Sequence, residues 1–184
     1  MNLAQLAEGH DPSAVALISR NRETTYADLV DQVAHLRGGL AAAGIGRGDR
    51  VAILCGNNRF FVVTYLATLG VGAVAVPLNP ASPAPEIARE LGVVGPAAAV
   101  LDQGAVGVWG QLPAATAAAV RLVVTVEGPG PGTPLADLLG ADPVPIADVD
   151  PDTAAVMMFT SGTAGPPRAA VLSHASLLAN LEQT

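Results

Sequence analysis

The sequence predicts an α/β fold with a mainly parallel sheet that helices cover on both faces. Two observations carry this prediction. Segments with strand character alternate with segments of helical character, and most of the strand segments are continuous apolar runs, such as 51–54 and 73–76. Such runs are typical of strands buried on both faces by helices. Hydrophobic residues make up 51% of the 184 residues and aromatic residues only 3%, so we expect a core of Ala, Val and Leu.

The first elements expected are a short helix over 3–7, a strand near 15–19 and a long amphipathic helix. Thr25 is the expected N-cap of the long helix, with Asp28 three residues on as a capping-box partner. Gly44 stands where a C-terminal cap belongs. The apolar face of this helix recurs at steps of four, three and four residues, at Leu29, Val33, Leu36 and Leu40.

The following segments continue the alternation. A turn over 46–49 precedes the apolar strand, and Gly70 and Gly72 divide the long apolar run over 60–76 into a helix and a strand rather than a membrane span. The expected elements are strands over 51–54, 73–76, 97–101, 122–126 and 154–159, a helix capped by Asn57 or Asn58 and ending near 69, and a short helix over 83–91 with proline in its first turn.

The chain is expected to be one domain or a piece of a larger one. A Gly/Pro-rich stretch, about 128–134, has the composition of a linker, and a second stretch rich in Pro and Asp, 142–152, leads to the strand over 154–159. No internal repeat is evident.

The net charge limits the classes of binding partner to expect, and the cysteine content indicates the redox state of the cellular compartment. The net charge of −7 disfavours nucleic acid and anionic membrane surfaces as partners. All nine basic residues are arginine, so chemistry that needs an ε-amine must come from outside this chain. Cys55 is the single cysteine, expected as a small buried apolar residue, which fits a reducing cytoplasm. Residues 1–5 carry no basic region, so no signal peptide is expected.

The segment 160–168 is the strongest candidate for a functional site. It follows the apolar strand over 154–159, and it combines hydroxyls, glycines and a cation. Glycines let the backbone approach an anion closely, main-chain N–H groups supply donors, and arginine adds a permanent charge. The pattern therefore predicts a loop that holds a phosphate chain, and its residues are Thr160, Ser161, Gly162, Thr163, Ala164, Gly165 and Arg168.

Two known glycine-rich motifs do not fit this sequence. A Walker A loop requires lysine after its last glycine, whereas Gly165 is followed by Pro166 and the chain has no lysine. The paired glycines at 44 and 46, and at 70 and 72, follow a helix and precede a strand, which is the reverse of the dinucleotide fingerprint. An ordinary surface loop without a ligand remains open on the residues alone.

The segment 160–168, with Ser173 and His174 following, resembles the phosphate-binding signature of the adenylate-forming enzymes. These include acyl-CoA synthetases, acyl-AMP ligases, luciferases and peptide-synthetase adenylation domains. Three upstream segments, 25–29, 46–53 and 72–80, are also similar to landmarks of this family in the same order. The chain looks most similar to fatty acyl-CoA synthetases.

The resemblance implies an ATP-dependent ligase. A fatty or other carboxylic acid would react with ATP to give acyl-AMP and pyrophosphate, and the acyl group would then pass to a thiol, with CoA as the expected acceptor. The residues of segment 160–168 would cradle the β- and γ-phosphates, Arg168 would replace the family's lysine, and Mg²⁺ would supply counter-charge. No catalytic residue and no metal ligand is expected within 1–184, because the family's catalytic lysine and acidic metal ligand come later.

Three residues depart from the family pattern. Ala164 replaces a threonine, Arg168 replaces the lysine, and Ala169 replaces a glycine. Ala169 would strain the backbone if that glycine position had a positive φ. An alternative is therefore a degenerate, non-catalytic remnant that serves as a protein-interaction module.

Residues 1–184 are expected to form the N-terminal portion of the AMP-binding domain, inactive alone and without the C-terminal lid domain. Apolar surface left uncovered is expected to drive self-association. His174 is interpreted as a structural residue at a helix start, with a position facing the acyl or nucleotide pocket as the alternative. Trp109 is expected in the core or at an interface.

Overall fold

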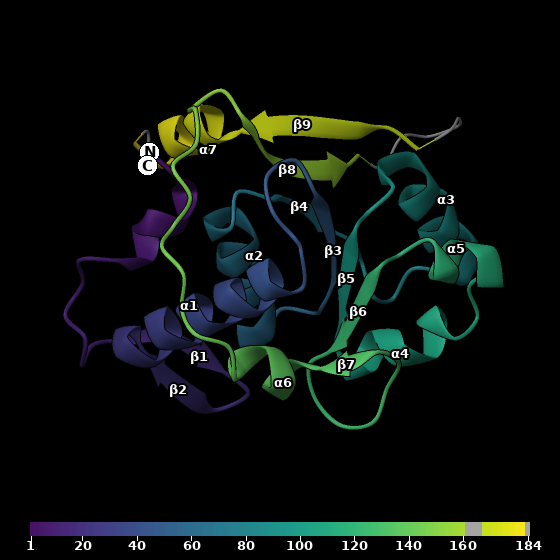
Figure 1. The fold of residues 1–184 in the computed structure, drawn as a ribbon, viewed down its shortest axis with the longest axis horizontal. Helices are drawn as coiled ribbons and strands as arrows, with labels where there is room; N and C mark the ends of the chain where they lie inside the picture. Colours follow the sequence, from purple (N-terminus) through teal and green to yellow (C-terminus); the bar gives the residue numbers. More distant parts are fainter. Residues whose placement is uncertain (161–166, 183–184) are drawn as a thin grey trace.

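A computed structural model describes residues 1–160 and 167–182 and contains two sheets (Figure 1). A hairpin of β1 (Val15–Ser19) and β2 (Arg22–Thr25) forms the smaller one. The strands of the larger sheet are β3 (Arg50–Leu54), β4 (Val74–Pro77), β5 (Ala98–Leu101), β6 (Leu122–Thr125), β7 (Thr133–Pro134), β8 (Ala154–Phe159) and β9 (Ala169–Ser173). The helices are the 3-10 helix η1 (Leu3–Ala7) and the α-helices α1 (Tyr26–Ala42), α2 (Arg59–Gly70), α3 (Ala84–Val94), α4 (Gln103–Trp109), α5 (Ala114–Ala118), α6 (Leu135–Leu139) and α7 (His174–Glu182).

The large sheet has seven strands in the order β7-β6-β5-β3-β4-β8-β9. All neighbouring pairs are parallel except β8 and β9, which form an antiparallel pair at one edge. The predicted α/β fold with a mainly parallel sheet is therefore confirmed, and the structure adds the antiparallel edge strand β9, which is not among the expected strands.

Both faces of the sheet are buried because helices cover each of them. Along β3, Val51 and Ile53 pack into a cluster with residues of α1, α2 and α6, whereas Ala52 and Leu54 pack into a second cluster with residues of α3 and α4. These four side chains are 0% exposed. The apolar run over 51–54 thus reflects burial on both sides, as in other parallel sheets.

The local helix signals act as the sequence predicts. The Thr25 side chain accepts a hydrogen bond from the Asp28 N–H at 3.1 Å, and the Asn58 side chain caps α2. Gly44 has a φ of +76°, a conformation that glycine adopts without the steric cost of a Cβ. Helix α3 continues to Val94, beyond the expected end at 91, and β2, α4, α5 and α6 are additional elements that the sequence analysis does not predict. Residues 133–134 of the stretch with linker composition pair with β6 as β7.

After the carboxyl ends of β3 and β5, the chain turns toward opposite faces of the sheet. Helix α2 follows β3 on one face, and α4 follows β5 on the other. Asp102 occupies this position and is buried. Its carboxylate accepts hydrogen bonds from the Gly56 N–H at 2.7 Å and from Asn58 Nδ2 at 3.0 Å, and it caps α4 through the Gly104 N–H at 2.9 Å. Asp102 therefore joins two strand ends, and its hydrogen-bonding capacity is used structurally.

Residues 141–153, which we call the crossing segment, carry the chain from α6 at one edge of the sheet to β8 near the other, over the face that α1 and α2 cover (Figure 1). The Ala147 N–H donates to the Gly70 carbonyl at 2.7 Å. Arg37 Nε donates to the Val144 carbonyl at 2.6 Å, and Asn2 Nδ2 donates to the Ala147 carbonyl at 3.1 Å. The crossing segment is thus fixed to η1, α1 and α2.

Two consecutive glycines in α1 permit close packing of the crossing segment and α6. A Cβ on Gly38 would lie 2.0 Å from the Asp142 carbonyl oxygen, and one on Gly39 would lie 2.4 Å from the Leu138 carbonyl oxygen. Glycine within a helix costs about 1 kcal/mol relative to alanine. Here the close backbone approach explains why the helix contains two.

The N-terminal residues link the end of α2 to α7. Asn2 Nδ2 also donates to the Leu69 carbonyl at 2.8 Å, and the Leu3 N–H donates to His174 Nδ1 at 3.1 Å. His174 is 1% exposed. The two ends of the described chain therefore lie beside each other (Figure 1). None of the helices in the described ranges has the length and hydropathy needed to cross a bilayer.

Two buried threonines of α2 differ from the other buried polar residues. Thr64 and Thr68 are both 0% exposed, and neither Oγ1 atom has a hydrogen-bond partner among the residues that the structure describes. An unpaired buried hydroxyl costs free energy because it loses its bonds to water.

Replacing Thr64 with valine, which keeps the shape and removes the hydroxyl, is expected to raise the free energy of unfolding by up to about 1 kcal/mol in urea denaturation. Thr125→Val is the matched control. Thr125 is also buried, but its Oγ1 donates to the Pro131 carbonyl at 2.7 Å, so the same change should lower stability by about 1–3 kcal/mol. Equal losses in both variants would contradict this account.

Stability is also expected to depend on His174 below neutral pH. Burial lowers the pKa of His174, and the nearby N-terminal amino group lowers it further. An unfolded histidine has a pKa of about 6.5, so below that pH the unfolded state binds more protons and acidification favours unfolding. The free energy of unfolding should therefore fall as the pH decreases from about 7 to about 5.

His174→Asn retains an acceptor for the Leu3 N–H but does not titrate. Its unfolding free energy, measured by urea denaturation at several pH values, should decrease less over the same interval. Every other residue is the same in both proteins, so the difference between the two slopes isolates His174. Identical slopes would contradict the structural role assigned to this side chain.

Candidate functional site

The two ends of the segment 160–168 meet at the end of a β-hairpin. Thr160 directly follows β8, and Arg168 directly precedes β9. Phe159 pairs with Ala169 across the two strands, and the Thr160 N–H donates to the Arg168 carbonyl at 3.4 Å. The β8–β9 pair thus brings the predicted first and last residues of the phosphate loop together at one end of the sheet.

Residues 161–166, between these ends, are not described. Thr160 and Arg168 are placed and exposed, and Arg168 has no ion pair within 4 Å among the described residues. The other predicted phosphate-binding residues, Ser161, Gly162, Thr163, Ala164 and Gly165, lie outside the described ranges. The site can therefore be built only from its two strands and from the residues at the loop ends.

A bulge in β8 sets which side chains surround the loop ends. The register shifts between Ala154 and Val156, so Ala155 and Val156 both pack into the α1–α2 cluster. Beyond the shift, Met157 and Phe159 pack against the opposite cluster, with α3. Alternation along the strand then places Met158 on the α1–α2 side, where it is 47% exposed.

Ala169 does not strain the backbone. It is the first residue of β9, and the non-glycine residues with positive φ in the described ranges are Arg20 and Asn21. The condition for strain, a positive φ at this position, is not met, because the chain is extended here and pairs with Phe159. An alanine side chain is compatible with this conformation.

His174 lies at the other end of β9 from Arg168. The five residues of β9 separate the two, so that six residue steps, about 20 Å in a strand, lie between them. The His174 ring accepts a hydrogen bond from the Leu3 N–H, and the backbone N–H of His174 donates to the Thr153 carbonyl at 3.2 Å. These contacts support the structural interpretation of His174 over a position in the nucleotide pocket.

Other reactive side chains have structural surroundings. Burial raises the pKa of the Cys55 thiol to about 12, with a smaller contribution from the Asp102 carboxylate. The thiolate that reacts as a nucleophile is therefore scarce at neutral pH. Trp109 is buried at 5% exposure in the cluster with α3. Residues 1–160 and 167–182 contain no group of three His, Cys, Asp or Glu side chains placed to hold a metal ion.

The hairpin supplies a rigid base for a ligand loop. Its two strands pair along their length, and β8 also pairs with β4 through Ala75 and Val156. A loop that carries hydroxyls, glycines and an arginine at such a strand end can surround a phosphate chain with donors. The sequence patterns missed β9, although the apolar run 169–172 gave a signal for it.

The chain is similar to known proteins over nearly all of its length. The family model of the AMP-binding enzymes matches residues 4–184. The chain is 33% identical over 174 residues to the phenyloxazoline synthase MbtB of Mycobacterium sp. (strain MCS), covering 94% of this chain and 14% of that protein. It is 35% identical over 170 residues to a feruloyl-CoA synthase of Amycolatopsis sp., covering 92% of this chain and 32% of the synthase.

The fold is also that of solved structures. ATP-bound MatB from Rhodopseudomonas palustris is 31% identical and superimposes with a TM-score of 0.83, covering 97% of this chain and 36% of MatB. The chain thus spans about a third or less of the length of these relatives. The match over nearly all of its residues shows that the chain belongs to the family of AMP-binding, adenylate-forming enzymes.

Proposed function

We propose that the chain is the N-terminal part of an ATP-dependent ligase that activates a fatty or other carboxylic acid and passes the acyl group to a thiol, with CoA as the acceptor. Membership of the AMP-binding family supports the adenylation step. The acid, the acceptor and the activity itself are parts of the proposal. The 184 residues are proposed to be inactive alone, since they span about a third or less of their relatives.

In the proposed reaction a carboxylate oxygen attacks the α-phosphorus of ATP. The bond between this phosphorus and the bridging oxygen breaks, and pyrophosphate leaves with the electron pair. Negative charge develops on the α-phosphate and on the leaving group. Donors and cations already in position stabilise that charge, so residues that hold the phosphate chain lower the barrier.

We assign the phosphate-holding role to the loop between β8 and β9. Thr160 would donate its hydroxyl and Arg168 its guanidinium, from the two ends that the hairpin holds together. Arginine presents a planar set of donors that fits two phosphate oxygens, whereas lysine offers a single ammonium group. Arg168 is exposed and free of ion pairs in the described residues, so its guanidinium is available to an anion.

Mg²⁺ belongs to the proposal as counter-charge for the phosphates of ATP. This ion is usually held by one or two carboxylates together with phosphate oxygens, rather than by a cage of protein ligands. As the family resemblance implies, the acidic ligand of this ion is proposed to come from outside residues 1–184.

The alternative role is a non-catalytic interaction module. The observation that supports this alternative is the absence of lysine from the loop, where the family pattern has one. The two proposals differ in one measurable step, because only an adenylating enzyme exchanges labelled pyrophosphate into ATP when an acid is present. Assaying the whole gene product that contains residues 1–184 against a panel of fatty and aromatic acids separates them.

The loop assignment predicts the effect of Arg168 substitutions in this assay. Arg168→Ala should lower acid-dependent exchange by about 10²-fold or more, the scale seen when one transition-state donor is removed. Arg168→Lys, which restores the family's residue, should retain most of the activity. Arg20→Gln is the control, because Arg20 is exposed and lies on the β1–β2 turn.

Two outcomes would contradict this account in different ways. No exchange with any acid, from a protein whose circular dichroism shows a folded state, would support the interaction module. Normal pyrophosphate exchange in Arg168→Ala would contradict the assignment of Arg168 to the phosphate site, whereas the proposed ligase activity would stand.

A further inference from the structure

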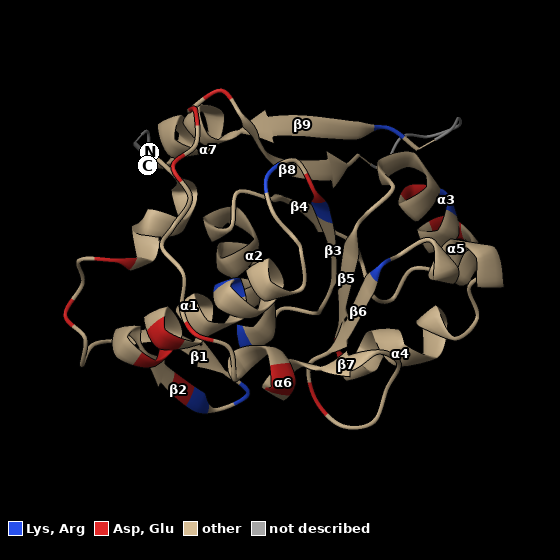
Figure 2. Ribbon diagram, in the orientation of Figure 1, with Lys and Arg blue, Asp and Glu red and all other residues tan. Residues whose placement is uncertain are grey.

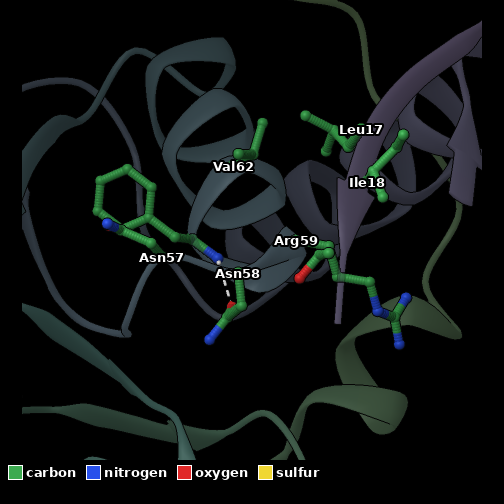
Figure 3. A pocket seen from close by; sticks show the side chains of 8 residues that line it. Leu17, Ile18, Asn57, Asn58, Arg59 and Val62 are labelled. Carbon is green, nitrogen blue, oxygen red and sulfur yellow. Dashed lines mark hydrogen bonds between the residues drawn. The ribbon is translucent and has the colours of Figure 1, made fainter. Parts of the chain in front are cut away.

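A small groove lies between β1 and the first turns of α2 (Figure 3). Its volume is about 210 Å³. In Figure 1 the two elements that form it lie on the opposite side of the molecule from the β8 end that carries Thr160. The groove therefore does not belong to the proposed phosphate site, and the family resemblance assigns it no role.

The walls of the groove are mainly apolar. Leu17 and Ile18 come from β1, whereas Phe61 and Val62 come from α2. Figure 3 shows Leu17 and Ile18 facing the end of the helix that carries Val62. Ile18 is 71% exposed, and Leu17 and Val62 are half-buried. A hydrocarbon group in the groove would remove this apolar surface from water, which is favourable in proportion to its area.

One end of the groove carries a cation. The Arg59 side chain extends past the lower end of β1, below Ile18 (Figure 3). Its Nη1 donates to Gln32 Oε1 at 3.0 Å, and its guanidinium carbon lies 4.2 Å from the centre of the Phe60 ring. Neither partner carries a negative charge. In the ranges that the structure describes, no carboxylate lies within ion-pair distance of Arg59.

Charges of both signs lie near the Arg59 guanidinium. Burial lowers the pKa of Arg59, the Arg22 guanidinium lowers it further, and Glu127 acts in the opposite direction. Glu127 is already shared with Arg20, whose Nη1 lies 3.9 Å from its carboxylate. The protein as a whole has a net charge of −7. Figure 2 shows a basic and an acidic residue side by side on β2, next to the groove.

We propose that this groove binds a small amphipathic carboxylate, a monocarboxylic acid with a short hydrocarbon body. The carboxylate pairs with Arg59, and the hydrocarbon packs against Leu17, Ile18 and Val62. A guanidinium group has five N–H donors in a planar arrangement that suits a carboxylate, and Arg59 uses one of them in the described contacts. The volume is below the ~300 Å³ of pockets for drug-sized ligands, so the ligand is small.

A titration of the 184-residue chain with sodium hexanoate tests the proposal, with ¹H–¹⁵N NMR spectra as the readout. Saturable shifts are expected at the amides of Ser19, Asn57 and Val62, which surround the groove. Shifts confined to β8 and β9 would place the acid elsewhere and overturn the proposal. No ATP is present, so the result is independent of the proposed ligase activity.

Variants separate the two parts of the recognition. Arg59→Gln should weaken hexanoate binding about tenfold or more, a factor equivalent to about 1.4 kcal/mol. Arg89→Gln is the matched control, because Arg89 is exposed on α3 and hydrogen-bonds within its own helix. Ile18→Ser should also weaken binding, and folding should tolerate it because Ile18 is mostly exposed.

The opposite results are equally distinct. Hexanol has a hydrocarbon chain of the same length without the carboxylate, so equal binding of hexanol would exclude recognition by Arg59. Unchanged hexanoate affinity in Arg59→Gln, with a folded spectrum, would do the same. Shifts at these amides that follow protein concentration rather than hexanoate would show that a second copy occupies the groove.

Discussion

The position of the candidate phosphate loop depends on the crossing segment. This segment leaves the sheet at α6 and returns to it at β8, so it decides where the β8–β9 hairpin lies. Its polar backbone groups are bonded to three separate elements, through Asn2, Arg37 and the Gly70 carbonyl. Buried carbonyls need such partners because water is excluded from them. The close approach of α1, through Gly38, completes the contact.

The pairing of β8 with its neighbouring strands determines where the two ends of the loop lie. β8 contacts the parallel part of the sheet through a single register position, Val156 opposite Ala75. Its longer pairing is with β9, which closes the loop through Thr160 and Arg168. The hairpin is therefore a local unit joined to the core by β4, the crossing segment and the N-terminal contact to His174. In the proposed phosphate site, the β8–β9 hairpin holds the two ends of the loop, and the loop supplies the hydrogen-bond donors.

The parts of the fold that the sequence predicted are those encoded within a few residues. Thr25 and Asn58 cap helices with their own side chains, and Gly44 ends a helix through its own φ. The apolar run over 51–54 indicates a strand buried on both faces, and this inference does not require knowing which strands are its neighbours.

The remainder depends on contacts between distant residues. The pairing of β9 with β8, which makes Ala169 an unstrained strand residue, follows from tertiary structure rather than from local pattern. Asp102 gains its role only because β3 and β5 are neighbours. The groove at Arg59 exists because β1 packs beside α2, and no local pattern in either segment indicates it. For the candidate site, sequence located the loop and the structure placed its two ends.

Hydrogen exchange in Gly38→Ala tests the role of the crossing segment most directly. A Cβ at this position would meet the Asp142 carbonyl at 2.0 Å, so the segment must move away from α1. If it positions the hairpin, the β8 amides of Val156 and Met158 will exchange faster than in the parent chain, while the β3 amides of Val51 to Leu54 stay protected. Equal loss of protection in β3 and β8, or none in β8, would contradict the account.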